Sequence, residues 1–222
     1  MEQYKIDFIK FLVEANSLKF GEFTLKSGRV APYFLNVGCF YTGERINRLA
    51  DFYAQSYISN KMKADVIFGP AYKGIPLATA TVSTLYSKYD KNLSYCFNRK
   101  TAKTYGQKDN TVGAELTDKT ELVLIDDVIT AGTAIREVAE LLKNYGNPKI
   151  NGILISLNRM EKNNDGNNAI EELEKELNTK VYSIVNLDEV IEVLYNHEIN
   201  GKIYIDDEKK DIIDKYRSTY GI

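Results

Sequence analysis

The chain has 222 residues, of which 44% are hydrophobic, and its formal net charge is −2 at pH 7. This length and composition suffice for a buried core, and we expect one domain spanning residues 1–222. The near-neutral balance argues against a surface built for nucleic acid or an anionic membrane. The chain shows no secretory signal pattern, no uncharged stretch long enough to span a bilayer and no CxxC pair, so we expect a cytoplasmic protein without nucleic-acid or membrane partners.

The first 60 residues are expected to hold two amphipathic helices with a segment of different character between them. Apolar side chains recur at helical spacing from Ile6 to Val13 and again from Ile46 to Tyr57. Between these stretches, glycine and proline residues interrupt short extended pieces within residues 18–40. We interpret residues 18–40 as a small antiparallel hood.

From residue 64 onward, short apolar runs alternate with helical stretches. Runs of apolar residues without alternation predict strands that are covered on both faces. The five runs are "DVIFG", "LSYCFN", "ELVLID", "NGILISLN" and "KVYSIVN". Residues 135–142 and 170–177 each have one apolar helical face. The pattern predicts an α/β fold with an open, mostly parallel sheet flanked by helices, and ligands at the carboxyl ends of its strands.

Two further segments are polar. The stretch "EKNNDGNNA", residues 161–169, is rich in Asn, Asp and Gly and is predicted to be a surface loop. Residues 206–222 are expected to form a charged terminal helix that serves packing or solvation rather than chemistry.

Two adjacent carboxylates, Asp126 and Asp127, follow a buried run and precede the small, hydroxyl-rich segment "VITAGTA". Neighbouring carboxylates disfavour each other's ionisation unless a cation or several donors share them. A loop that enters a helix presents unpaired backbone N–H groups to an anion, and Thr130, Gly132 and Thr133 suit a phosphate. Because carboxylates repel phosphate but accept hydrogen bonds from sugar hydroxyls, the stretch indicates a ribose 5-phosphate site.

Two alternatives stay open on these residues alone. In the first, the threonines only cap a helix and the aspartates are solvated. In the second, one aspartate is the nucleophile of a phosphatase, although adjacent residues of an extended strand point to opposite faces. The absence of the G-x-x-x-x-G-K-[ST] pattern excludes a nucleotide P-loop.

The stretch "VLIDDVITAGTA" is similar to a signature for binding 5-phosphoribosyl pyrophosphate (PRPP). Together with four further blocks, it resembles the orotate phosphoribosyltransferase family, a group of type I phosphoribosyltransferases. "LKFGEFTLKSGRVAPYF", "FGPAYKGIPLA", "YCFNRK" and "GILISLNR" also match in order and spacing, and the resemblance weakens after about residue 187. It implies the conversion of PRPP and orotate to orotidine 5′-monophosphate and pyrophosphate in de novo UMP synthesis, through an oxocarbenium-like transition state. It also implies Mg²⁺ as cofactor, held mainly by PRPP, pyrophosphate and water.

The resemblance assigns the site residues as follows. Catalytic roles are implied for Asp126, Asp127, Lys73 and Lys103. PRPP binding is implied for Lys26, Tyr72, Lys73, Arg99, Lys100, Lys103, Tyr105, Asp126, Asp127, Val128, Ile129, Thr130, Ala131, Gly132, Thr133 and Ala134. Orotate binding is implied for Lys26, Phe34, Leu35, Thr130 and Arg159. The guanidinium of Arg159 suits a carboxylate, and "GPAYKG" is expected to contain a non-proline cis peptide that receives the pyrophosphate.

Residues 99–112 are expected to form a mobile lid. Residues 99–110 carry four basic side chains and one aspartate, a net charge of 4 − 1 = +3, and they follow a strand end. By resemblance, the lid closes over the pyrophosphate bound to a neighbouring subunit, which implies a homodimer. Tyr105 stands where relatives often carry histidine, and its phenol is not cationic at neutral pH, which argues against a histidine-dependent proton transfer.

Two other functions share the PRPP motif. One is a non-catalytic PRPP-sensing regulator, against which the lysine-rich lid argues. The other is a transferase for a different base such as a purine. Arg159 favours orotate, because a purine base has no carboxylate.

Overall fold

The computed structural model describes residues 1–25, 28–100 and 110–222. In these ranges the helices are α1 (Gln3–Glu14), α2 (Gly43–Ser59), α3 (Gly74–Tyr89), α4 (Thr133–Leu142), α5 (Ala169–Leu177), α6 (Leu187–Leu194) and α7 (Asp207–Tyr220). The strands are β1 (Leu18–Thr24), β2 (Val30–Leu35), β3 (Val66–Phe68), β4 (Ser94–Asn98), β5 (Thr111–Gly113), β6 (Glu121–Asp126), β7 (Lys149–Asn158), β8 (Val181–Asn186), β9 (Glu198–Ile199) and β10 (Lys202–Ile203). Two single 3₁₀ turns, Val37–Cys39 and Lys143–Tyr145, complete these elements.

The central sheet has six strands in the order β5-β4-β3-β6-β7-β8. Strand β5 pairs antiparallel with β4, and all other neighbours are parallel. The predicted mostly parallel sheet is therefore confirmed, with each of the five apolar runs forming a strand. Sequence patterns did not predict β5, helix α6 or the short hairpin β9-β10, which are too brief for a periodic signal.

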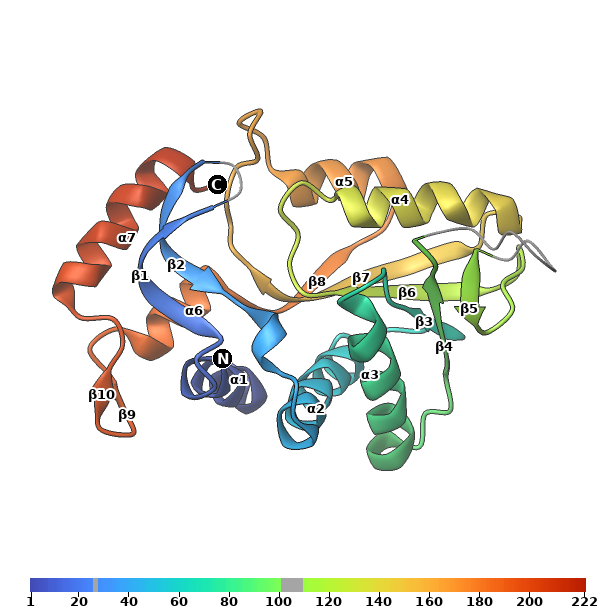
Figure 1. Ribbon diagram of the computed structural model, residues 1–222, viewed down its shortest axis with the longest axis horizontal. Coiled ribbons are helices and arrows are strands. Elements are labelled where there is room, and N and C mark those ends of the chain that lie inside the picture. Colours follow the sequence, from blue (N-terminus) through green and yellow to red (C-terminus); the bar gives the residue numbers. More distant parts are fainter. Residues whose placement is uncertain (26–27, 101–109) are drawn as a thin grey trace.

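Helices cover both faces of this sheet (Figure 1). Helices α1, α2 and α3 lie on one face, and α4 and α5 lie on the other. Successive residues of β6 enter different cores: Val123 and Ile125 pack with α1 and α2, whereas Leu122 and Leu124 pack with Ile135 of α4. Because successive strand residues point to opposite faces, an unbroken apolar run is the pattern that such a doubly covered strand requires.

The predicted hood is a separate antiparallel hairpin made of β1 and β2, and it lies beside α7 (Figure 1). The buried ring of Tyr33 on β2 meets that of Tyr216 on α7 edge-on, with ring centroids 6.0 Å apart. Helix α7 thus packs against the hood as well as facing solvent, as its sequence led us to expect.

The order of the strands creates a switch point between β3 and β6. From β3 the chain continues outward to β4, whereas from β6 it continues in the opposite direction to β7 and β8. The loops that leave β3 and β6 therefore diverge, and ligands of open α/β sheets bind in the crevice between such loops.

Candidate active site

The loops after β3 and β6 meet through an ion pair. Lys73, in the turn that leads from β3 into α3, places its Nζ 2.7 Å from Oδ2 of Asp127. The lysine side chain is 65% exposed, whereas that of Asp127 is only 9% exposed. The switch point thus holds a solvent-accessible cation beside a buried carboxylate.

The turn after β3 is tightly constrained. A Cβ atom on Gly69 would lie 2.1 Å from the carbonyl oxygen of Gly74, so only glycine permits this approach. The predicted non-proline cis peptide is present between Ala71 and Tyr72. The backbone N–H of Ala71 donates to Oδ1 of Asn98, the last residue of β4, at 2.7 Å. A neighbouring strand therefore fixes the turn that carries Lys73.

Side chains from two other elements hold the backbone of the acidic pair. The hydroxyl of Tyr53, on α2, donates to the carbonyl oxygen of Asp126 at 2.8 Å. Ser156, on β7, donates to the carbonyl oxygen of Asp127 through both its hydroxyl and its backbone N–H, at 2.6 and 2.9 Å. Tyr53 and Ser156 are fully buried. Both aspartates are thus presented from a rigid backbone.

The environment of the pair opposes its full ionisation. Burial, and then the adjacent Asp127 carboxylate, raises the pKa of Asp126 to about 7, from an ordinary value of 3.8. The backbone N–H of Asp127 donates to Oδ1 of Asp126 at 2.9 Å, and that of Val128 donates to Oδ1 of Asp127 at 2.8 Å. A carboxylate held at this cost gains from any cation or hydroxyl donor that reaches it.

The segment after the acidic pair has the geometry of an anion-binding loop: it leads into the uncapped N-terminus of α4. Gly132 adopts a left-handed φ of 72° and precedes α4, whose N-terminus has no side-chain cap. The backbone N–H groups of this first turn lie at the positive end of the helix dipole. Residues Asp126 and Val128 to Ile135 line a cavity of about 380 Å³ here. The loop therefore fits the predicted phosphate position.

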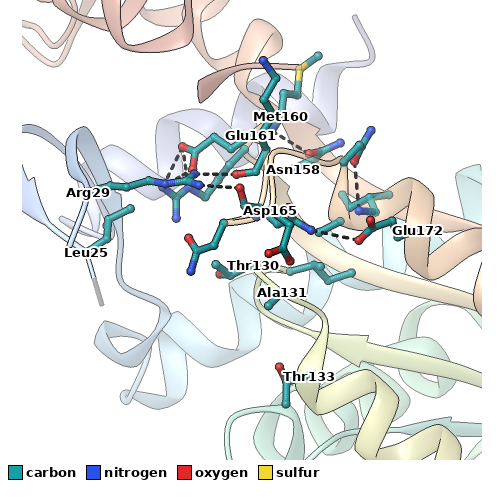
Figure 2. Close-up of a pocket in the computed structure, with 18 of the residues that line it drawn as sticks. Leu25, Arg29, Thr130, Ala131, Thr133, Asn158, Met160, Glu161, Asp165 and Glu172 are labelled. Atoms are coloured by element: carbon teal, nitrogen blue, oxygen red, sulfur yellow. Dashed lines mark hydrogen bonds and ion pairs between the residues drawn. The ribbon is translucent and has the colours of Figure 1, made fainter. Parts of the chain in front are cut away.

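A second cavity, of about 620 Å³, is drawn in Figure 2 and shares lining residues with the first. Thr130, Ala131 and Thr133 line both cavities. The facing wall consists of the segment after β7, including Arg159, and the hood supplies Leu25 and Arg29. The phosphate loop and Arg159 thus border one continuous space.

The side chain of Arg159 is held by Glu161. Its Nε and Nη2 donate to Oε1 of Glu161 at 3.1 and 2.8 Å, and both side chains are nearly buried. Met160, between them, has a left-handed φ of 53°, and its N–H donates to Oδ1 of Asn158 at 2.8 Å. The turn brings residues 159 and 161 together. Glu161 is therefore nearly buried, which corrects the prediction of a surface loop at this residue, whereas residues 164–167 are exposed as predicted.

Other predicted residues lie apart from this arrangement. Phe34 is 40% exposed and stacks on Phe23, with ring centroids 5.6 Å apart. Neither Phe34 nor Leu35 is among the described residues that line the cavity of Arg159. Lys100 pairs with Glu137 of α4 at 3.0 Å.

The remaining predicted residues near the switch point and in the lid are either exposed or outside the residues that the structure describes. Arg99 is exposed and donates its backbone N–H to the carbonyl of Asn110, and Tyr72 is 72% exposed. Lys26, Lys103 and Tyr105, with most of the predicted lid 99–112, lie outside the described residues.

Comparison with known proteins bears on this arrangement directly. Residues 37–187 match the phosphoribosyl transferase domain family. The chain is 48% identical to the orotate phosphoribosyltransferase of Colwellia psychrerythraea and 44% identical to that of Clostridium acetobutylicum, each alignment covering 100% of both chains. The chain belongs to the orotate phosphoribosyltransferase family. The match continues beyond residue 187, where we expected the resemblance to weaken.

The fold of that family is also the fold observed here. The crystal structure of the orotate phosphoribosyltransferase from Francisella tularensis superposes with a TM-score of 0.84 at 40% identity, covering 97% of this chain and 100% of that one. Membership of a phosphoribosyltransferase family argues against both alternatives left open by the acidic pair, the simple helix cap and the aspartyl phosphatase.

Sequence reasoning did not identify several residues that shape the site. Three of them, Tyr53, Ser156 and Asn98, form hydrogen bonds to backbone atoms of the site. Arg29 binds the carbonyl oxygen of Lys162, and Glu161 binds the guanidinium of Arg159 and the hydroxyl of Tyr33. Only Asn98 had a signal, as a polar residue at a strand end. The others come from elements whose relative positions the sequence pattern does not reveal.

Within residues 1–25, 28–100 and 110–222, no cluster of three or more His, Cys, Asp or Glu side chains is arranged to bind a metal ion. In the same ranges, none of the helices has the length and apolar character needed to cross a bilayer.

Proposed function

We propose that this chain transfers the 5-phosphoribosyl group from PRPP to orotate, giving orotidine 5′-monophosphate and pyrophosphate in de novo UMP synthesis. The observation that carries the proposal is a pair of adjoining cavities along the phosphate loop, which form a space lined by Asp126 at one end and by Arg159 at the other. Such a space fits a ribose phosphate at one end and an anionic base at the other. Full-length relatives named orotate phosphoribosyltransferase support the same reaction.

In the mechanism that we propose, the acidic pair acts on the ribose. Asp126 and Asp127 accept hydrogen bonds from its hydroxyls and face the positive charge that develops at C1′ as pyrophosphate leaves. A carboxylate about 5 Å from that charge contributes roughly 3 kcal/mol at an effective dielectric constant near 20, about a hundredfold in rate. Lys73 neutralises the leaving pyrophosphate, with Lys103 of the lid assigned the same role.

For orotate, we propose that Arg159 binds the carboxylate. Its Nε–Nη2 edge is occupied by Glu161, so the free N–H groups of Nη1 and Nη2 are the ones available to the substrate. Thr130, which lines the same cavity, and Lys26 of the hood complete the proposed base site, whereas Phe34 and Leu35, which do not line this cavity, stay predictions.

We also propose Mg²⁺ as the cofactor. The two carboxylates of the acidic pair are hard oxygen donors that suit this ion, but Asp127 already pairs with Lys73. This donor set fits an ion bound mainly through PRPP oxygens and water, with the protein adding at most one or two ligands. When bound, Mg²⁺ supplies positive charge to the pyrophosphate. Chelation with EDTA is expected to abolish turnover, and added Mg²⁺ to restore it.

The proposed working unit is a cytoplasmic homodimer whose lids are shared between subunits. Two exposed tyrosines, Tyr72 near the pyrophosphate turn and Tyr86 on α3, offer apolar surface for such an interface.

A mixture of Lys103→Ala and Asp126→Asn chains tests whether the lids are shared between subunits. If the lid acts in trans, hybrid dimers regain one intact site and the mixture recovers about a quarter of wild-type activity. If each subunit closes its own lid, mixing restores nothing.

The decisive assay offers the purified protein PRPP and Mg²⁺ with orotate, uracil or purine bases in parallel. Loss of orotate together with formation of its nucleotide is the expected result. Turnover of a purine, or binding of PRPP without turnover of any base, would instead support the other two functions that share the motif.

A further inference from the structure

Glu161 is a nearly buried carboxylate in the cavity that we propose for an anionic substrate. It lines the cavity that also contains Arg159, and its side chain is 11% exposed. This inference rests on the proposed function, in which the cavity receives an anionic base. The negative charge of Glu161 beside that base opposes its binding through charge repulsion. A residue kept there at that cost needs another explanation.

The contacts of Glu161 indicate one. Its Oε1 accepts two N–H groups of Arg159, and its carboxylate also accepts the hydroxyl of Tyr33 from β2. Burial, and then the Glu161 charge, raises the pKa of Tyr33 far above its ordinary value, so this hydroxyl remains a donor. The Arg159 guanidinium additionally lies 5.6 Å from the centroid of the Tyr33 ring. These contacts fix both the edge and the plane of the guanidinium.

The segment that carries Glu161 is itself fixed from two sides. From the hood, Arg29 donates Nη1 to the carbonyl of Lys162 and Nη2 to that of Asn163, both at 2.6 Å, and reaches across the cavity wall (Figure 2). From the end of α7, residues 220–222 pair with residues 160–162 through two backbone hydrogen bonds, of 2.8 and 3.1 Å. Glu161 is therefore a fixed point rather than part of a free loop.

We propose that Glu161 is a positioning residue for orotate, which holds the Arg159 guanidinium so that its free N–H groups face the substrate carboxylate. Arginine has several rotatable bonds, and an arginine that must be ordered by the substrate binds it less tightly than one ordered beforehand. The gain from this order exceeds the repulsion between Glu161 and the substrate.

The test compares Glu161→Gln and Glu161→Asp with wild type. Glutamine keeps the shape but loses the charge, and aspartate keeps the charge but is one methylene too short to reach Arg159 and Tyr33 together. Both are expected to raise the KM for orotate by about tenfold while kcat and the KM for PRPP stay within about twofold. Glu174→Gln is the matched control. Glu174, on α5, is also a mostly buried carboxylate that accepts from a lysine, Lys180, and from a backbone N–H, that of Val181, but it does not line this cavity.

A double-mutant cycle distinguishes positioning from a general structural role. In an Arg159→Lys background, which cannot form the same fork, Glu161→Gln is expected to change the KM for orotate by less than about twofold. Should a Glu161 variant fail to fold, Tyr33→Phe tests the same contact from the other side, with an expected rise of about threefold.

The possible results distinguish failure of this inference from failure of the proposed function. A Glu161→Gln enzyme with an unchanged or lower KM for orotate overturns the inference, because charge repulsion would then dominate. An equal rise in the KM for PRPP, or a full tenfold effect in the Arg159→Lys background, also overturns it. A wild type that does not consume orotate refutes the proposed function and the inference with it, whereas an active wild type with an indifferent Glu161 refutes the inference alone.

Discussion

The two ends of the active-site space are built in different ways. The end that we propose for PRPP, called the PRPP end below, is made where neighbouring parallel strands stop: the turn after β3 and the acidic pair at the end of β6 meet at Lys73 and Asp127. The end that we propose for orotate, called the orotate end, is assembled from three segments far apart in sequence, namely the hood, the turn after β7 and the end of α7.

This difference has a physical origin. At the PRPP end, position is set by buried strands and by hydrogen bonds to backbone carbonyls, so the chemistry depends on the central core. At the orotate end, position is set by side chains such as Arg29 and Glu161 that bridge separate elements. We therefore expect substitutions at the first end to lower kcat without a selective change in the KM for orotate, and substitutions at the second to raise the KM for orotate selectively.

The largest expected effect is at the PRPP end. In the variant with both Asp126→Asn and Asp127→Asn, two contributions of roughly 3 kcal/mol are removed, which together correspond to a loss of up to about ten-thousandfold in kcat. Steady-state formation of orotidine 5′-monophosphate measures it, with circular dichroism as the check on folding. A folded double variant that retains substantial turnover would rule out the assigned role.

Although replacing the acidic pair is expected to lower activity, replacing Asp126 alone is expected to raise the stability of the folded protein. Because the pKa of Asp126 is raised to about 7 in the folded protein, its contribution to stability is present below about pH 4 and is lost as the pH rises through 7. The difference from 3.8 corresponds to roughly 4 kcal/mol. Asp126→Asn cannot ionise, so its stability relative to wild type is expected to improve by up to that amount between about pH 4 and pH 8.

Urea unfolding at several pH values measures this difference. Glu140→Gln, at a side chain that is 73% exposed, serves as the control and is expected to show little pH-dependent change. If Asp126→Asn loses stability relative to wild type as the pH rises, the ionised carboxylate is stabilised rather than opposed by its surroundings.

The contrast between the two ends also explains what the sequence could predict. The acidic pair, the phosphate loop and the turn containing Lys73 are contiguous motifs at strand ends, so their mutual proximity follows from parallel topology alone. The resemblance identifies Arg159, but the composition of residues 161–169 places its partner Glu161 in a surface loop. Composition indicated solvent there, whereas contacts with the hood and the end of α7 bury it. Such contacts join elements whose docking no local pattern encodes.

A smaller effect is expected from the support beneath the acidic pair. Tyr53→Phe removes the hydroxyl that binds the carbonyl of Asp126 and leaves this acceptor unpaired in the core, at a cost of about 1 to 2 kcal/mol in stability. We expect transition-state stabilisation to fall by a similar amount, which lowers kcat about tenfold and leaves the KM for orotate unchanged. Tyr57→Phe, one turn along α2, is the control. A selective rise in the KM for orotate would contradict the division into two ends.

The smallest effect is expected at the hood. Arg29→Ala removes two hydrogen bonds to the carbonyls of Lys162 and Asn163 and the contact of the guanidinium with the Tyr220 ring. Because Arg29 is partly solvated, water can replace the two lost hydrogen bonds at the carbonyls of Lys162 and Asn163. We therefore expect the KM for orotate to rise by only about threefold to fivefold.

Arg48→Ala is the matched control for this change, because Arg48 also lies over an aromatic ring, that of Phe11, but packs between α1 and α2. For both variants the KM for PRPP is expected to stay at the wild-type value. If Arg29→Ala weakened PRPP and orotate equally, the hood would be supporting the whole space, and the orotate end would not be separately built.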